Sequence, residues 1–334
     1  MSAGESGAPV SGAPVSGAPV SGAPVSGAVG LGVGVDAGVG PDAGLGAGGR
    51  PDAVGRRDAG GRRRRGGHPT LVIGLILTGI VVLVALVSLV WLPYPLSDTS
   101  GGRLDSPNPA HLLGTDRLGR DLLSQLMVGA RIALAVGAGS VLLAAVLGTL
   151  LGLAAAFARP WIDDTLSAAL DVVIAFPVLL LAMLVVAVQG ASLWSAILAI
   201  GLAMSAVVAR LTRILARRVL QEQFVTAART SGTGTAGLIV RHVLPNIAPT
   251  LLVSLALQFG IAVLAEASLS YLGLGAPPPN ASWGRMLQEA QGTVLVAPVG
   301  AIAPGIAIVA LVLGVNFLAD GLREFADPTR RRSR

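Results

Sequence analysis

The sequence predicts an all-α, polytopic membrane protein with six transmembrane helices and a disordered N-terminal tail. Hydrophobic residues make up 53% of the 334 residues and charged residues only 13%, whereas an ordinary soluble domain carries about 25% charged residues. Six apolar stretches are each long enough to cross a hydrocarbon core about 30 Å thick, which takes roughly 20 helical residues. The chain has no cysteine, so disulfides and thiolate metal sites are excluded.

The first 69 residues differ in composition from the rest of the chain. Residues 6–25 are four copies of Ser-Gly-Ala-Pro-Val, and the run to residue 49 is mostly Gly, Ala and Val. Such a segment buries too little apolar surface to offset the entropy lost on ordering, so we expect it to be disordered. It lacks the basic start and compact apolar run of a signal peptide. Four arginines at residues 62–65 stand just before the first apolar stretch.

The six expected spans follow in chain order at residues 70–91, 131–158, 166–188, 192–209, 247–271 and 296–318. In the second span, small residues recur at four-residue steps, at Ala144, Gly148, Gly152 and Ala156. Small residues let two helix backbones approach closely in lipid, where such packing drives helix association. We therefore expect this face to pack against another helix, either of the same chain or of a partner.

The arginines set the orientation of these spans, and all 24 basic residues are arginines. With the N-terminus inside, 19 of them are cytoplasmic: 7 in the tail, 1 between the second and third spans, 6 in the loop 210–241 and 5 at the C-terminal end. Only 5 lie outside. The bias of basic residues toward the cytoplasm predicts that both termini and the basic loop are cytoplasmic. It also accounts for the net charge of +6 without a nucleic-acid partner.

The most informative motif lies in that basic loop. Residues 227–232 read Ala-Ala-Arg-Thr-Ser-Gly, and a His-Val-Leu-Pro run follows that ends at Pro245. We expect Gly232 to end one short helix and Thr233 or Thr235 to start the next. A proline costs least at the first helical position, so we expect Pro245 to set the entry into the fifth span. Such a loop suits the presentation of a short helix to a soluble protein; a plain amphipathic surface hairpin is the alternative.

Four further segments accompany this loop in a fixed order. They are residues 114–121 (Gly-Thr-Asp-Arg-Leu-Gly-Arg-Asp), 266–275 (Glu-Ala-Ser-Leu-Ser-Tyr-Leu-Gly-Leu-Gly), 282–287 (Ser-Trp-Gly-Arg-Met-Leu) and 320–324 (Asp-Gly-Leu-Arg-Glu). Together with the loop and the span count, they resemble the second, C-type permease subunit of the ATP-binding cassette (ABC) importers for dipeptides, oligopeptides and nickel. The resemblance covers about residues 68–330.

The resemblance implies the type I ABC-importer permease fold, in a protein of the bacterial inner (cytoplasmic) membrane. Four parts are expected: the disordered cytoplasmic tail at 1–69, the first transmembrane helix with an external segment at 70–128, the permease core at 129–322 and a basic cytoplasmic C-terminus at 323–334.

The resemblance also implies a subunit of an ATP-driven importer that carries short peptides or related cargo such as nickel chelates. Its expected partners are a homologous second permease, two ABC ATPase subunits and an external substrate-binding protein. ATP and Mg²⁺ would bind to the ATPase subunits, since this chain has no lysine and hence no Gly-x-x-x-x-Gly-Lys phosphate loop. The loop 224–241 would couple transport to ATP hydrolysis, with ATPase contacts at Ala227, Ala228, Gly232, Leu244 and Pro245.

Polar and ionisable residues inside the spans are candidates for the transport path or a gate. They are Asp171, Glu266 and Asn316. Asp171 alternatively reaches the cytoplasmic interface, and Glu266 either lines the path or braces the outer gate by pairing with an external arginine. The Gly- and Pro-rich segment 273–283 is expected to be an outer loop with an exposed tryptophan. It would face the binding protein at Ser282, Trp283 and Gly284.

Two other classes of protein share some of these features. A membrane scaffold would use the basic loop only to recruit a soluble partner, without transport. An integral-membrane enzyme is disfavoured, because the sequence shows no catalytic Ser/His/Asp cluster and no metal-ligand spacing among its three histidines. We therefore expect no catalytic, cofactor or metal site in this chain.

Overall fold

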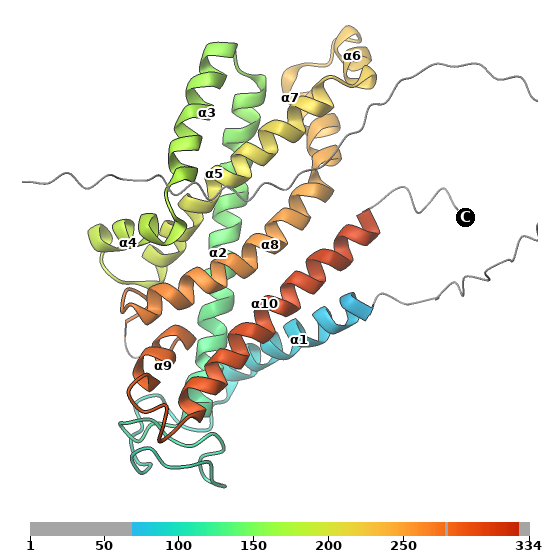
Figure 1. The fold of residues 1–334 in the computed structure, drawn as a ribbon. Coiled ribbons are helices and arrows are strands. Elements are labelled where there is room, and N and C mark those ends of the chain that lie inside the picture. The colour runs from blue at the N-terminus through green and yellow to red at the C-terminus, as the bar shows by residue number, and fades with distance from the viewer. Residues whose placement is uncertain (1–68, 278–279, 327–334) are drawn as a thin grey trace, which may run out of the picture. The chain divides into compact units, whose positions relative to one another are not determined.

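The computed structural model describes residues 69–277 and 280–326. Residues 1–68 of the predicted tail, most of the basic C-terminus and residues 278–279 lie outside the described residues. The described chain is all-helical, as predicted, with one isolated β-bridge between Thr115 and Asp121. Figure 1 shows long helices in a bundle, with α6 and α7 at one end and α9 toward the other.

The helices are, in chain order, α1 (Pro69–Val90), α2 (Leu122–Phe157), α3 (Pro160–Ala175), α4 (Val178–Gln189), α5 (Leu193–Leu220), α6 (Gln223–Thr230), α7 (Thr235–Leu238), the π-helical turn η1 (Ile239–Val243), α8 (Leu244–Tyr271), α9 (Trp283–Ala290) and α10 (Val299–Ala326).

Five helical runs of the described chain are long and apolar enough to cross a membrane. They are α1, α2, α5, the continuous run Thr235–Tyr271 formed by α7, η1 and α8, and α10. The pair α3 and α4 reaches the same length and hydropathy only when its two helices are taken together. The described chain therefore has five spans, or six if this bent pair counts as one.

The third predicted span, 166–188, is wrong as a single straight helix. α3 and α4 meet at 90° around Pro177, and Figure 1 shows α4 turned across the end of α3. Proline has no N–H to donate into a helix, and it forces the preceding residue out of the helical region. Phe176 accordingly has φ −81° and ψ 132°.

Other helices extend beyond their predicted spans, α2 and α5 among them. α2 begins at Leu122 because Asp121 caps it, accepting a hydrogen bond of 2.8 Å from the Ser124 N–H. α5 continues past residue 209 to Leu220, since arginine is a good helix former and a polar surface does not end a helix. Apolar composition predicts where a helix lies in lipid and leaves its ends undetermined.

The small-residue face of α2 packs against α5 within the same chain. A Cβ added at Gly148 would lie 2.5 Å from the Val208 Cβ, and one added at Gly152 would lie 2.4 Å from the Ala209 carbonyl oxygen. Real Cβ atoms essentially never come so close to either group. The two backbones therefore approach to a distance that only glycine permits, and α5 is the most buried of the long helices.

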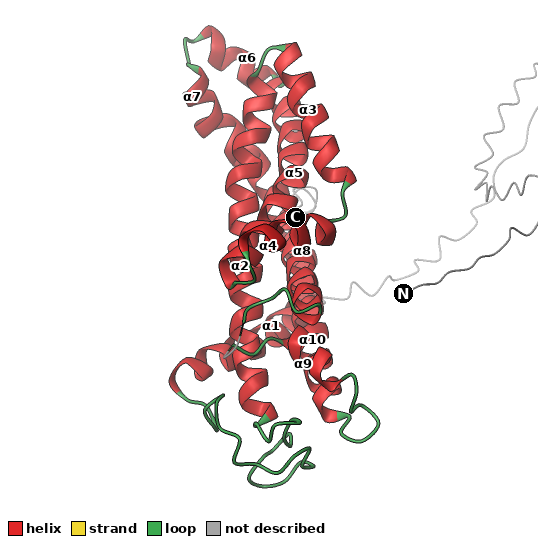
Figure 2. Cartoon of the chain, turned by 90° about the vertical axis from the view of Figure 1, so that its left-hand side faces the viewer, coloured by secondary structure: helices red, strands yellow, loops and turns green. Residues whose placement is uncertain are grey.

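α1 and α10 form a second close pair. A Cβ at Gly74 of α1 would lie 2.8 Å from the Gly314 carbonyl oxygen, and one at Gly321 would lie 2.4 Å from a Leu71 side-chain carbon. α8 lies beside α10 and also contacts α2, so it joins the two pairs. Figure 2 shows that the longest loop, which precedes α2, lies at the end of the bundle opposite α6 and α7.

A Gly152→Ala substitution tests the α2–α5 contact. The added methyl group has no room, so we expect overpacking to cost about 1–3 kcal/mol, seen as a lower unfolding temperature of the detergent-purified protein. Gly79→Ala on α1 is the matched control, because nothing lies within 4 Å of its added Cβ. Equal unfolding temperatures for the two variants would contradict the close packing.

Candidate functional site

The predicted break in the basic loop lies at Gly232. α6 ends in a Schellman motif, in which the Thr233 N–H donates to the Ala228 carbonyl and the Gly232 N–H donates to the Arg229 carbonyl, each at 3.0 Å. Gly232 has φ +84°, a left-handed conformation that glycine adopts without steric cost. α7 starts at Thr235, so the expected order of helix end and helix start is confirmed.

The hairpin of α6 and α7, residues 223–238, projects from the ends of α5 and α8 (Figure 1). Its anchor is Val225, which is fully buried. Ala227 and Gly232 are exposed and Ala228 is half-buried. The exposed side chains of α6 therefore include the small Ala227 together with Phe224 and Arg229, whereas Val225 fixes the inward side of the helix.

Pro245 lies in the first turn of α8, as expected for a proline that sets the entry into the fifth span. The helical run starts at Thr235 and passes through the wider π-turn before Pro245. In this turn the Leu244 N–H donates to the Ile239 carbonyl. A π-turn changes which carbonyls are paired, and it commonly marks a functional segment. Leu244 is half-buried and Pro245 is exposed.

A buried carboxylate near the same end of the bundle escaped the sequence analysis. Asp163, in the first turn of α3, is 2% exposed. It accepts hydrogen bonds from Arg213 Nε and Nη2 and from Arg217 Nη2, all on α5, and the Arg213 Nη2 to Asp163 Oδ2 distance is 2.7 Å. The sequence did carry a signal for this contact: the two arginines are four residues apart, which places both on one face of α5. This Asp163 clamp ties α3 to the C-terminal half of α5.

Asp171, eight positions further along α3, also pairs with α5. Its Oδ1 lies 3.2 Å from Arg210 Nη1, and both side chains are more than half exposed. The pairing places the Asp171 side chain on the exposed surface of the α3–α5 pair.

Glu266 on α8 is buried, at 2% exposure. Its carboxylate accepts a hydrogen bond of 2.6 Å from the Ser270 hydroxyl. Among the described residues, no basic nitrogen lies within 4.0 Å of this carboxylate, so the expected brace to an external arginine is absent there. Asn316 on α10 is half-buried and faces α8, where a Cβ at Gly260 would lie 3.4 Å from its Oδ1.

The expectation that Trp283 is exposed in an outer loop is wrong. It begins α9 and is 2% exposed, and its Nε1–H donates to the Leu126 carbonyl at 3.0 Å. Ser282 caps the same helix by accepting from the Arg285 N–H at 3.3 Å. A Cβ at Gly284 would lie 1.9 Å from the Ala267 carbonyl oxygen. These residues seat α9 between α2 and α8, so their side chains form no outward surface.

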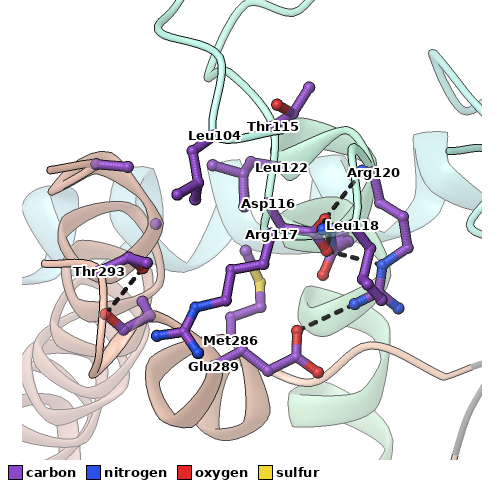
Figure 3. Close-up of a pocket in the computed structure, with 14 residues that line it drawn as sticks. Leu104, Thr115, Asp116, Arg117, Leu118, Arg120, Leu122, Met286, Glu289 and Thr293 are labelled. Carbon is purple, nitrogen blue, oxygen red and sulfur yellow. Dashed lines mark hydrogen bonds and ion pairs between the residues drawn. The ribbon is translucent and has the colours of Figure 1, made fainter. Parts of the chain in front are cut away.

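A polar network connects α9 to the segment before α2. Asp116 accepts hydrogen bonds from Arg120 Nε at 2.7 Å and from Gln125 Nε2 at 3.0 Å. Arg120 Nη2 also donates to Glu289 at 3.1 Å, and Glu289 accepts from Arg285 at 2.9 Å. Figure 3 shows Arg120 between its two carboxylate partners. Beside them is a cavity of about 250 Å³.

Comparison with known proteins gives three related results. A family model described as binding-protein-dependent transport system inner membrane component matches residues 148–332. The dipeptide transport system permease protein DppC of Alkalihalophilus pseudofirmus is 37% identical over 258 residues, which are 77% of this chain and 85% of that protein. The glutathione transport system permease protein GsiD of Pectobacterium atrosepticum is 40% identical over 224 residues, 67% of this chain and 74% of that protein.

Among solved structures, a chain of the MetNI methionine ABC transporter, determined in inward-facing conformations, matches with a TM-score of 0.52. The match covers 61% of this chain and 96% of that chain at 19% identity, so it shows the fold alone. The fold and the sequence relatives agree. This chain belongs to the family of binding-protein-dependent transport system inner membrane components, and it is a non-catalytic, multi-pass permease subunit of an ABC importer.

Proposed function

We propose that this chain forms a translocation path for short peptides together with a homologous second permease. Two ABC ATPase subunits, which bind ATP and Mg²⁺, drive transport from the cytoplasm, and an external binding protein delivers the cargo. Peptide cargo is supported by the dipeptide and glutathione permeases among the relatives, and by a putative peptide transport permease of Brucella abortus that is 39% identical over 263 residues. Nickel chelates are the next candidate cargo.

The observation that carries this proposal is the α6–α7 hairpin. Its outward side chains are small at Ala227, and its shape is set by the left-handed Gly232. A short helix can lie close against a groove of an ATPase subunit at a position where its exposed side chain is as small as an alanine. The contact surface that we propose comprises Ala227, Ala228 and Gly232, with Leu244 and Pro245 at the base of the hairpin.

The hairpin transmits motion because it is fixed to long helices. α5 ends at Leu220 and α6 begins at Gln223, so only two residues separate them. The Asp163 clamp adds α3 to α5 through two arginines. We propose that α3, α5 and α6 move as one body when the ATPase subunits close, and that α7 pulls directly on α8. Asn316 on α10, which is half-buried and faces α8, is the pathway candidate that we retain.

The proposed topology puts both termini and the hairpin in the cytoplasm. The hairpin end of the bundle carries the arginines of α5, α6 and η1, in line with the bias toward basic cytoplasmic loops. The α9 end, with the long segment before α2, would then face outward.

Gly232→Val tests the coupling hairpin. A β-branched residue is strained at φ +84°, so the variant is expected to misplace α7 and to separate ATP hydrolysis from peptide uptake. Purified complexes in liposomes give both rates, and we expect uptake per ATP to fall about ten-fold or more. Gly234→Ala is the control, since its φ is −69° and its added Cβ meets nothing within 4 Å.

Normal uptake by Gly232→Val at normal membrane abundance would contradict the coupling role. If the chain were a membrane scaffold, a third result would be expected. The wild-type complex would bind its soluble partner through the hairpin, but ATP hydrolysis would be accompanied by no peptide uptake. The same liposome measurement separates these outcomes.

Single cysteines test the topology, because the chain has none of its own. Thr235→Cys and Ser106→Cys are suitable, as both positions are exposed, whereas Ser282 is buried. In intact spheroplasts, an impermeant maleimide is expected to label the Ser106 variant and to leave the Thr235 variant unlabelled until the membrane is opened. The reverse pattern would overturn the topology.

Asp163→Asn tests the clamp. We expect a loss of about 1–3 kcal/mol, below the ~3–5 kcal/mol for a fully buried ion pair, because the Arg213 and Arg217 side chains are 21% and 43% exposed. Uptake per ATP should also fall, since α3 no longer follows α5. Asp164→Asn, at the exposed neighbouring position, is the control for the unfolding temperature and for coupling. Identical behaviour of the two variants would exclude the clamp.

A further inference from the structure

The cavity beside α9 has walls from two distant parts of the chain. Its lining includes Leu104, Arg117 and Leu118 from the segment before α2, and Met286, Glu289 and Thr293 from α9 and the turn after it. The hydrogen bond of 3.1 Å between Arg120 and Glu289 joins the two walls (Figure 3). The walls are therefore fixed relative to each other without any bound partner.

One charged group of this pocket, Arg117, forms no ion pair with any residue that the structure describes. Asp116 and Glu289 are both engaged by Arg120, and Glu289 also by Arg285. Within the described part of the chain, no carboxylate lies within 4.0 Å of an Arg117 nitrogen. Arg117 is exposed, and in Figure 3 it extends from its own segment toward the turn that carries Thr293. Its positive charge is thus presented to whatever enters the pocket.

Two backbone features shape the pocket around Arg117. A Cβ at Gly292 would lie 2.2 Å from Arg117 Nη2, so the absence of a side chain there leaves room for the guanidinium. Leu104 has φ 58°, the only positive φ outside glycine among the described residues, and its N–H donates to the Asp116 carbonyl at 3.0 Å. Strained backbone of this kind persists where its surroundings fix it, and it clusters at binding sites.

We infer that this pocket receives an acidic side chain of the external substrate-binding protein, whose carboxylate pairs with Arg117 while its stem packs on the apolar wall. The inference rests on the proposed function, which requires such a partner. A guanidinium binds a carboxylate through two parallel hydrogen bonds, and Leu104, Leu118 and Met286 offer the apolar surface.

The size and charge of the pocket favour a side chain over cargo. Its volume of about 250 Å³ is below the range of roughly 300–1,000 Å³ typical of small-molecule sites. A short peptide also carries an ammonium group that needs a carboxylate. Asp116 and Glu289 are both already paired with arginines, so the pocket matches an anion and not a zwitterion.

The test measures docking of the binding protein to the complete importer complex in lipid nanodiscs. Its dissociation constant is determined by biolayer interferometry without nucleotide, at low and at physiological salt. Arg117→Gln is expected to weaken docking about ten-fold at low salt, with a smaller effect at higher salt. Gly292→Ala should weaken it as well, because the new methyl displaces the flexible end of Arg117 and touches no backbone.

Arg103→Gln is the matched control, since Arg103 is exposed in the same external segment and does not line the pocket. Its docking should stay within about two-fold of the wild type. Equal effects of the Arg103 and Arg117 variants, or no effect of Arg117→Gln in a folded complex, would overturn the inference.

A photo-crosslinking residue at Leu118, which is 63% exposed and lines the pocket, identifies the occupant in cells. A crosslink to the binding protein, mapped next to an Asp or Glu whose charge reversal restores docking of an Arg117→Glu variant, supports the inference. Crosslinks to lipid or to peptide alone would refute it. Docking is measured without ATP. A negative result in the Gly232 coupling test would therefore not change the outcome expected for docking.

Discussion

The close approach of α2 and α5 is the constraint on which the rest of the structure depends. In lipid, water gives no hydrophobic drive for one helix to join another, so backbone proximity has to supply the attraction. Gly148 and Gly152 provide it, because no side chain fits between them and α5. With α5 fixed to α2, the bent pair of α3 and α4 packs onto α5, and α8 closes against α2.

This arrangement makes α5 a rigid connection between the buried bundle and the α6–α7 hairpin. Near the C-terminal end of α5, polar interactions replace this apolar packing. There Asp163 holds α3 to α5 through two arginines on one face of α5. On the other side of the hairpin, the π-turn before Pro245 lets one helix run continue from α7 into α8. The hairpin is therefore connected to two helices at once, which is the geometry that the proposed coupling role requires.

The sequence predicts the features that depend on composition or on local backbone chemistry. The all-helical fold, the small-residue face and the helix break at Gly232 all follow from such signals. It misses what depends on distant contacts. Trp283 follows a Gly- and Pro-rich stretch that suggests an exposed loop, yet its side chain is buried because α9 packs between α2 and α8. One local signal is missed as well: Pro177 stands in an apolar run, and its missing N–H bends the chain there. The sequence does not show which partners a buried carboxylate has. In the structure, arginines donate hydrogen bonds to Asp163, whereas a serine donates one to Glu266.

We propose that α3, α5 and α6 move as one body during the transport cycle. Spin labels at Asp164 on α3 and Thr226 on α6, both exposed positions, give their separation by double electron–electron resonance in the complete complex. The account predicts overlapping distance distributions in the nucleotide-free and vanadate-trapped states, while a pair at Thr226 and Ser106 changes its distance. A shift of the first pair between the two states would show that α6 moves independently of α3, and would contradict the account.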